Sequence, residues 1–314
     1  MMTSPREFDL LAFGDPVADI MLRADALPPV GGKTLGQSLG IWPGGTTANV
    51  ACAAARLGLR SALFGRTGDD AYASLLRASL LGHAVDTRWL SSMAQTPSAS
   101  AIAVLAPTGE KSIIYMPMPA APVEAHGLAQ ALAQTRMMYA MPYDFDQFAG
   151  LCHQARQAGV RIAIDLEAAV APDPGQMRRR AALADIVFFN EAGFLAGTGQ
   201  PPTPDAMREV LALGPGEVVV TLGAEGAVAI NHGGHARHVA FPATVRDTTG
   251  AGDSFNAAYL CARLAGQALP EALRFACAAA SCTVAALGAR GGLPDQQRVA
   301  CVLQHGIRPK ETSA

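Results

Sequence analysis

Short apolar runs with strand character alternate along this chain with helical patterns that stop at a glycine. The runs cover residues 8–13, 61–64, 137–141, 161–166, 185–189 and 217–222. The helical patterns cover residues 47–57, 71–81, 145–158 and 204–213, and they stop at Gly58, Gly82, Gly159 and Gly214. Glycine just past the last periodic residue is a common helix stop. Because strands that are apolar along their whole length belong to parallel sheets covered on both faces, the pattern predicts an α/β fold with a mostly parallel central sheet.

Other segments interrupt this alternation. Residues 101–105 and 111–115 read as a β-hairpin around the turn at 107–110, and residues 31–41 are Gly-rich with short strand-like pieces. We expect these segments to form a small sheet that stands off the main domain. Later in the chain, residues 227–230 and 238–241 predict a second hairpin, and residues 270–287 predict one long Ala-rich helix.

Composition excludes several classes of protein. The chain has 314 residues, half of them apolar and 16% charged, with a formal net charge of −2. Such a chain is compact, and its charge does not suggest a nucleic-acid-binding surface. The six cysteines form no C-x-x-C pair, which favours buried, reduced thiols over disulfides or a metal site. No apolar run has the ~18 residues that a membrane span needs, so we expect a cytoplasmic protein.

The strongest local signal is residues 247–255, which read DTTGAGDSF. Gly250 and Gly252 leave backbone N–H groups uncovered where a helix begins, and a helix N-terminus with bare amides is an anion site. Asp247 precedes this turn and Asp253 lies just inside the helix. A carboxylate inside an anion site indicates a base that deprotonates a group beside a phosphate.

Two further segments have the composition of ligand sites. Residues 44–50 read GGTTANV, and Asn49 falls in a first helical turn, where its amide can donate to and accept from sugar hydroxyls. The alternative is an ordinary helix start capped by Thr46 or Thr47. Asp19 lies close to the end of the first predicted strand, where ligands of parallel sheets bind. It is either a hydroxyl acceptor or a plain surface carboxylate.

Later strand ends carry weaker signals. Residues 221–226 read TLGAEG, which either allows a nucleotide to approach the backbone or forms a simple β-turn. Asn190 and Glu191 follow another strand and are similarly ambiguous. His232, His235 and His238 are spaced by three residues, but a hairpin turn does not force such imidazoles to converge on a metal. We therefore favour solvated histidines there.

Together these segments resemble the ribokinase-like (PfkB) carbohydrate kinases. The string 247–255 is similar to the family's C-terminal signature, and Gly44-Gly45 with Asn49 is similar to its N-terminal signature. The resemblance extends from about residue 8 to about residue 294. It implies a three-layer α/β/α sandwich with a small β-sheet lid, as a single domain over residues 1–314 with the lid in about 15–43 and 97–119. The exposed edges of a lid sheet suggest a homodimer that forms through it.

The resemblance also implies roles for individual residues. Members transfer the γ-phosphoryl group of ATP, with Mg²⁺, to an alcohol. The base would be Asp253, and the phosphate cradle would be Gly250, Ala251 and Gly252. The sugar would be held by Asp19, Gly44, Gly45 and Asn49, and ATP would lie near Asn190, Thr221, Gly223 and Gly226. A monovalent-cation (K⁺) site that some members possess would be formed by Asp247, Thr249 and Gly288.

Two positions depart from the family pattern. Members often carry Glu where this chain has Gly193, and that Glu is associated with Mg²⁺ and phosphate; Glu191 is the substitute that the sequence offers. Cys277 stands where some relatives place a polar residue against adenine, which leaves the nucleotide preference open.

The leading hypothesis is an ATP-dependent kinase of a small sugar or sugar acid. A nucleoside kinase would need an apolar platform, for which Trp42, Tyr115 and residues 116–118 are available. A phosphosugar or sugar-acid acceptor would need a cation, and the candidates are Arg66, Arg88 and Lys111. The alternative from another class is a non-catalytic sugar- or nucleotide-binding regulator. A dinucleotide-dependent oxidoreductase is disfavoured because no Gly-x-Gly-x-x-Gly motif follows Gly14.

Overall fold

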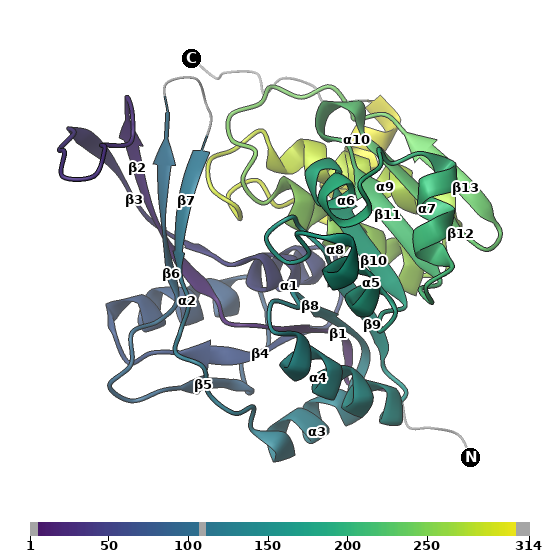
Figure 1. Cartoon of the computed structure of the whole chain (residues 1–314), viewed down its shortest axis with the longest axis horizontal. Helices are drawn as coiled ribbons and strands as arrows, with labels where there is room; N and C mark the ends of the chain where they lie inside the picture. Colours follow the sequence, from purple (N-terminus) through teal and green to yellow (C-terminus); the bar gives the residue numbers. More distant parts are fainter. Residues whose placement is uncertain (1–5, 107–110, 306–314) are drawn as a thin grey trace.

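The computed structural model describes residues 6–106 and 111–305. Its centre is a nine-stranded sheet in the order β13-β12-β11-β10-β9-β8-β1-β4-β5 (Figure 1). The strands are β1 (Phe8–Phe13), β4 (Ser61–Thr67), β5 (Leu90–Ser92), β8 (Thr135–Ala140), β9 (Arg161–Asp165), β10 (Ile186–Asn190), β11 (Glu217–Thr221), β12 (Ala227–Asn231) and β13 (Gly234–His238). Every apolar run that we assigned to the main sheet is therefore a strand of it.

Helices cover both faces of this sheet, because successive side chains of a buried strand point in opposite directions. In β1, Leu10 belongs to the apolar core on one face and Leu11 to the core on the other. The first face is covered by α1 (Thr46–Arg56), α2 (Ala71–Gly82), α8 (Ala251–Leu264), α9 (Leu269–Thr283) and α10 (Gln296–His305). The second face is covered by α3 (Ala125–Ala133), α4 (Phe145–Gln157), α5 (Pro174–Ala181), α6 (Glu191–Thr198) and α7 (Pro204–Leu211). The predicted three-layer α/β/α sandwich is confirmed.

The strands from β11 through β4 to β5 run parallel to their neighbours, and β12 and β13 add an antiparallel edge. The carboxyl ends of the parallel strands therefore meet at one edge of the sheet, where α/β proteins bind their ligands. Within the described residues, no helix combines the length and the apolarity needed to span a membrane.

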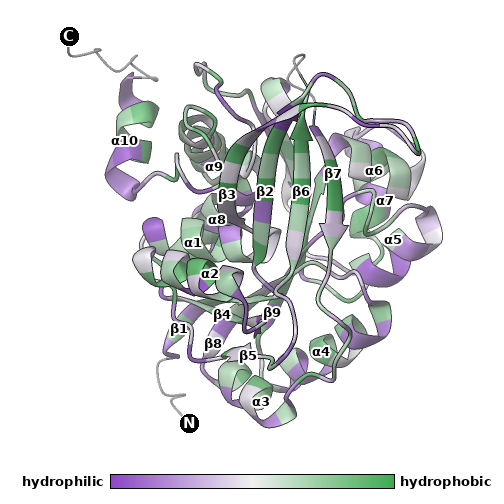
Figure 2. Cartoon of the chain, turned by 90° about the vertical axis from the view of Figure 1, so that its left-hand side faces the viewer, coloured by the Kyte–Doolittle hydropathy of each residue, from purple (hydrophilic) through white to green (hydrophobic). Residues whose placement is uncertain are grey.

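A second, four-stranded sheet has the order β3-β2-β6-β7 (Figure 2). Its strands are β2 (Val17–Ala24), β3 (Gly36–Gly44), β6 (Ser100–Leu105) and β7 (Lys111–Met116). Strands β3, β6 and β7 come from the two segments that interrupt the alternation, whereas β2 was not predicted as a strand. The predicted turn at 107–110 lies outside the described residues.

Two predicted boundaries are wrong. The second strand of the late hairpin is Gly234–His238 rather than 238–241, because a tight turn pairs Asn231 directly with Gly234 and the Asn231 side chain accepts the Gly233 N–H. The long Ala-rich helix ends at Thr283 rather than 287. The carbonyl of Val284 accepts the N–H groups of Arg246 and Asp247, and the chain then turns toward Gly288.

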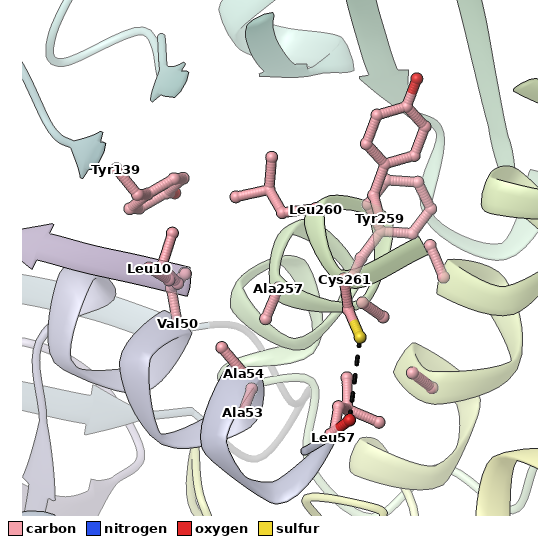
Figure 3. Close-up of a cluster of buried hydrophobic side chains, with 14 of the residues drawn as sticks. Leu10, Val50, Ala53, Ala54, Leu57, Tyr139, Ala257, Tyr259, Leu260 and Cys261 are labelled. Carbon is pink, nitrogen blue, oxygen red and sulfur yellow. Dashed lines mark hydrogen bonds between the residues drawn. The ribbon is translucent and has the colours of Figure 1, made fainter. Parts of the chain in front are cut away.

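Small side chains allow α1 and α8 to pack closely. Ala257 of α8 lies toward Ala53 and Ala54 of α1, and the Cys261 thiol reaches the carbonyl of Leu57 at 3.7 Å (Figure 3). These residues are buried in one apolar core. Close packing of the two helices brings their N-terminal ends together, and both ends carry residues predicted to be functional.

This packing predicts the effect of a larger side chain between the helices. Ala257→Leu should lower the free energy of unfolding by about 1–3 kcal/mol, because a tightly packed core has no room for the added carbons. Denaturant titration measures the change, and Ala149→Leu, a partly exposed position of α4, is the control. Unchanged stability of Ala257→Leu would show that the two helices are not closely packed.

Candidate active site

The string 247–255 forms the start of α8. Gly250 precedes the helix with a φ of +75°, and a β-carbon there would lie 2.6 Å from the carbonyl oxygen of Ala289, so only glycine suits this position. The N–H of Ala251 is bonded to the carbonyl of Thr248. A β-carbon on Gly252 would meet no heavy atom within 4 Å. The first helical turn thus presents the backbone of Gly252 to open space.

Asp253 lies in this turn and contacts Asn49 in the first turn of α1. The Nδ2 of Asn49 donates to Oδ2 of Asp253 at 2.7 Å. The pKa of Asp253 is raised to about 7, mainly by burial. The charges of Glu167 and Asp165 contribute to this rise, while the hydrogen bond from Asn49 and the charge of Arg290 oppose it. A carboxylate with a pKa near neutrality suits a group that accepts a proton at physiological pH.

Arg290 holds this pair in place, and the sequence analysis missed it. The Arg290 side chain is 7% exposed, and its Nε donates to Oδ1 of Asn49 at 2.9 Å. Its two terminal nitrogens donate to Oγ of Ser79 and to the carbonyl of Gly44, each at 2.8 Å. Because Oδ1 of Asn49 accepts from a guanidinium, its Nδ2 must face Asp253. The available signal was a lone charge among small residues, two positions after Gly288.

The residues predicted to hold the sugar belong to the same group. A β-carbon on Gly44 would collide with the carboxylate of Asp19, so glycine makes room for that side chain. Gly45 begins α1 with a φ of +92°. Burial raises the pKa of Asp19 to about 6, against the attraction of Arg290 and Lys111. The structure therefore brings Asp19, Gly44, Gly45 and Asn49 together around Asp253.

A cavity of about 460 Å³ lies on the other side of the α8 N-terminus. It is lined by Thr221, Gly223 and Gly226 at the end of β11, and by Ala251 and Gly252. Cys277 of α9 also lines it. Asn190 is adjacent to Thr221 in the sheet but is absent from the lining, because its side chain caps α6 by accepting the N–H of Gly193 at 2.7 Å.

The position of Gly193 explains why no glutamate stands there. A β-carbon on Gly193 would collide with the carbonyl of Leu166 and lie 3.1 Å from Cα of Glu167. The backbone of the half-buried Glu167 therefore occupies this space, and the charge of its side chain acts on Asp253 and Asp165. Glu191, the substitute that the sequence suggested, is exposed on the first turn of α6.

Asp165, at the end of β9, is a second buried acid near Asp253. Its Oδ2 accepts from Nδ2 of Asn256 at 2.7 Å, while Oδ1 has no hydrogen-bond partner among the described residues. Burial raises its pKa to about 7, and the charge of Glu167 adds to the rise. An orphaned buried oxygen beside a second carboxylate fits a hard cation such as Mg²⁺, which takes oxygen ligands.

Asp247, which was predicted to bind a monovalent cation together with Thr249 and Gly288, contacts both of these residues and Lys111. Oδ1 of Asp247 accepts from the ammonium of Lys111 at 2.5 Å, and Lys111 also bonds to the hydroxyl of Thr249. Gly288 directs its N–H, rather than a carbonyl, at Oδ2 of Asp247 at 2.9 Å. The carboxylate of Asp247 is therefore already paired with a cation of the chain itself.

The histidines at 232, 235 and 238 flank the late hairpin turn, and His238 stacks on Phe241 with a centroid distance of 5.3 Å. In the part of the chain that the structure describes, no group of three or more His, Cys, Asp or Glu side chains could hold a metal ion. A site with fewer protein ligands, such as the Asp165 and Glu167 pair, is not affected by that finding.

A larger cavity, of about 590 Å³, lies at the carboxyl ends of β1, β4 and β8. Aromatic and sulfur-containing side chains line it: Phe13, Phe64, Trp89, Met93, Tyr115 and Tyr143. Tyr115 and Tyr143 stack with a centroid distance of 6.5 Å. Burial raises the pKa of Tyr143 to about 12, and the charges of Glu167, Asp165 and Asp253 contribute to the rise, although none of these three acids lines the cavity.

The cations predicted for a charged acceptor are all paired with carboxylates of the chain. Arg66 bonds to Asp15 at 2.7 Å, and Arg88 bonds to Glu7 at 2.7 Å and to Asp86 at 2.8 Å. Lys111 is bonded to Asp247, as described above. The charge of each of the three is thus matched by a carboxylate of the chain, while Arg66 and Arg88 also line the cavity of about 590 Å³.

Comparison with known proteins gives a consistent result. The family model for "pfkB family carbohydrate kinase" matches residues 8–296. The chain is 29% identical to a ribokinase of Bacillus subtilis, over 93% of this chain and 98% of that protein. It is 30% identical to a nucleoside kinase of Methanothermobacter thermautotrophicus, over 91% and 93% of the two chains. A solved structure of Arabidopsis thaliana ribokinase complexed with ribose and ATP superposes with a TM-score of 0.82 at 28% identity, covering 95% of this chain and 99% of that one.

Proposed function

The chain belongs to the pfkB family of carbohydrate kinases, and on that premise we propose that it transfers the γ-phosphoryl group of ATP to an alcohol group of a small sugar. The observation that carries this proposal is the position of Asp253. It is a carboxylate with a pKa near 7 between the residues predicted to hold a sugar and the cavity predicted to hold a nucleotide.

Each residue of the site has a separate role in the proposed reaction. Asp253 removes the proton from the acceptor alcohol as its oxygen forms a bond to the γ-phosphorus. The bond between that phosphorus and the bridging oxygen breaks, and ADP leaves with the electron pair. Asn49 orients the Asp253 carboxylate, and Asp19 accepts a hydrogen bond from another hydroxyl of the sugar. The amides at the start of α8 stabilise the charge of the transferring phosphoryl group.

The nucleotide binds in the cavity beside Gly252. Thr221, Gly223 and Gly226 line that cavity with little side-chain bulk, so the base and ribose of ATP approach the backbone of the loop after β11. Cys277 and the apolar residues around it give this cavity a hydrophobic wall. Asn190 supports this region from the neighbouring strand by capping α6.

Mg²⁺ accompanies ATP in this proposal. Asp165, with its unpartnered Oδ1, and the adjacent Glu167 are the residues that would hold the ion in place of a glutamate at position 193. The exposed Glu191 is not favoured for this role. When bound, Mg²⁺ neutralises charge on the phosphate oxygens.

The paired arginines and lysine favour an acceptor without charge. A sugar acid or phosphosugar would meet cations whose charge Asp15, Glu7 and Asp247 already neutralise, so it would be attracted only weakly. A neutral sugar needs only hydroxyl partners, which Asp19 and Asn49 supply. Of the acceptors considered from the sequence, a neutral sugar is therefore favoured over a sugar acid.

A nucleoside is the second candidate acceptor. The cavity of about 590 Å³ is lined by aromatic rings that can stack against a base, including Tyr115 and Tyr143. Trp42 does not line this cavity; it packs over Gly288 instead. A non-catalytic regulator is disfavoured because the base and the amides around it are intact.

The small sheet is proposed to act as a lid and as a dimer interface. On the face opposite Asp19 and Tyr115 it carries exposed apolar side chains, Ile41 of β3 and Ile114 of β7. A second copy of the chain would cover such a surface, and sedimentation velocity that shows only monomers would contradict the dimer. ATP use and six free cysteines are compatible with a cytoplasmic location.

The proposed function is tested by an ATP-consumption screen with neutral sugars, sugar acids, phosphosugars and nucleosides, with and without Mg²⁺. We expect turnover with a neutral sugar or a nucleoside, and only with Mg²⁺ present. Absence of turnover with every acceptor would contradict a kinase and favour the regulator.

Asp253→Asn should reduce kcat by about 10²–10⁴-fold, because it removes the base and keeps the shape of the side chain. The dissociation constant of ATP, measured by calorimetry, should stay unchanged. Asp25→Asn, at an exposed position of the small-sheet region, is the control. Near-normal turnover of Asp253→Asn would show that another group is the base.

Gly252→Ala should affect stability and binding in opposite directions. The added methyl group meets no protein atom, and replacing a helical glycine raises the free energy of unfolding by up to about 1 kcal/mol. The same methyl group projects toward the bound phosphates, so the affinity for ATP should fall about tenfold or more.

The matched control for this substitution is Gly150→Ala, an exposed glycine inside α4 whose β-carbon would also meet nothing within 4 Å. It should gain similar stability and keep its affinity for ATP. Equal affinities of Gly252→Ala and Gly150→Ala would argue against phosphate binding at the α8 N-terminus.

A further inference from the structure

Among the described residues, Lys111 forms the one ion pair between the small sheet and the loop before α8. It is the first residue of β7, and its register partner is Leu105 at the end of β6, so it lies at the far end of that strand pair. From there its ammonium reaches Oδ1 of Asp247 at 2.5 Å and the hydroxyl of Thr249. The Lys111 and Asp247 side chains are only 18% and 9% exposed, so this is a largely buried ion pair.

Every polar atom of this contact has a partner. Oδ1 of Asp247 also accepts the N–H of Thr249 at 2.9 Å and its hydroxyl at 2.6 Å. The Thr249 hydroxyl therefore donates its hydrogen to Asp247 and accepts a hydrogen bond from Lys111. Oδ2 accepts the N–H of Gly288. Burial alone would raise the pKa of Asp247, but the bonds from Lys111, Thr249 and Gly288 outweigh it and lower that pKa to about 2.

Asp247 joins the two loops that shape the candidate phosphate site. It leads directly into Gly250, and through Gly288 it is tied to the loop that carries Ala289 and Arg290. Ala289 packs against Gly250, and Arg290 orients Asn49 toward Asp253. A charge at Asp247 that lacked its cation would disturb both loops, because an unpaired buried carboxylate is strongly unfavourable.

We propose that the Lys111 ammonium is a tethered monovalent cation that neutralises Asp247, so that phosphoryl transfer by this chain requires no K⁺. The proposal rests on the proposed kinase function for its catalytic part only. An ammonium is a compact point charge of the same sign and valence as K⁺, and it bonds to Asp247 and Thr249, two of the residues predicted to hold a free cation. Lys111 acts through Asp247 on the loop before α8, so it is a positioning residue.

The test compares the natural chain with Lys111→Ala, each exchanged into tetramethylammonium chloride and then titrated with KCl or NH₄Cl at constant ionic strength. The truncated side chain leaves space beside Asp247 that K⁺ or ammonium can fill and tetramethylammonium cannot. Two quantities are measured: the Tm of the protein without substrates, and kcat with an acceptor found by the screen.

We expect neither quantity of the natural chain to respond specifically to K⁺. In tetramethylammonium, Lys111→Ala should lose about tenfold or more in kcat, which corresponds to about 1.4 kcal/mol. K⁺ or ammonium should restore most of that activity and raise the Tm by about 2–4 °C through binding to the folded state. Lys33→Ala, at an exposed position between β2 and β3, should behave as the natural chain does.

Activation of the natural chain by K⁺ would overturn the proposal, and so would a Lys111→Ala variant whose Tm and kcat ignore K⁺. The Tm measurement separates this proposal from the proposed function, since it needs no acceptor. A K⁺-dependent Tm in Lys111→Ala without any kinase activity would support the tethered cation and contradict the kinase.

Discussion

The hydrogen bond between Asn49 and Asp253 is the contact on which the rest of the site depends. It joins the N-terminal ends of α1 and α8, which are 204 residues apart in the chain. The alanines between the two helices let them approach closely enough to form it (Figure 3). Arg290 fixes the direction of the Asn49 amide, and burial gives Asp253 a pKa near neutrality. The packing of two helices therefore determines the chemistry of one carboxylate.

The distribution of charge around this contact accounts for the proposed acceptor. Several acids, Asp19, Asp165, Glu167 and Asp253, lie near one another, and Arg290 is the cation buried among them. The cations further out are bonded to carboxylates of their own. A negatively charged acceptor would meet repulsion from these acids, whereas in the proposed reaction the phosphate of ATP would enter at the α8 N-terminus, where the helix amides and Mg²⁺ would supply positive charge.

The sequence predicted features that depend on local pattern, and it missed those that depend on contacts across the chain. Apolar periodicity located the strands β1, β4, β8, β9, β10 and β11 of the main sheet but not the short edge strand β5, and the glycine string located the start of α8. Arg290 was missed because its partners Asn49 and Gly44 are 241 and 246 residues away. Lys111 was considered as a cation for a charged acceptor, but its pairing with Asp247 follows from the position of the small sheet. Glu167, which we propose in place of the missing glutamate, was not predicted because only the fold brings its backbone against Gly193.

We propose that Asp253 is a base whose pKa is raised by burial. The most direct test is the pH dependence of kcat/KM with the best acceptor, which reports the essential base of the free enzyme. Because the base must be deprotonated, we predict that kcat/KM falls about tenfold per pH unit below an apparent pKa near 7 and is constant above it. The rise toward that plateau should move to higher pH in Asn49→Ala, which loses the bond that lowers the pKa. A profile that is flat down to pH 5, in the natural chain, would contradict the claim.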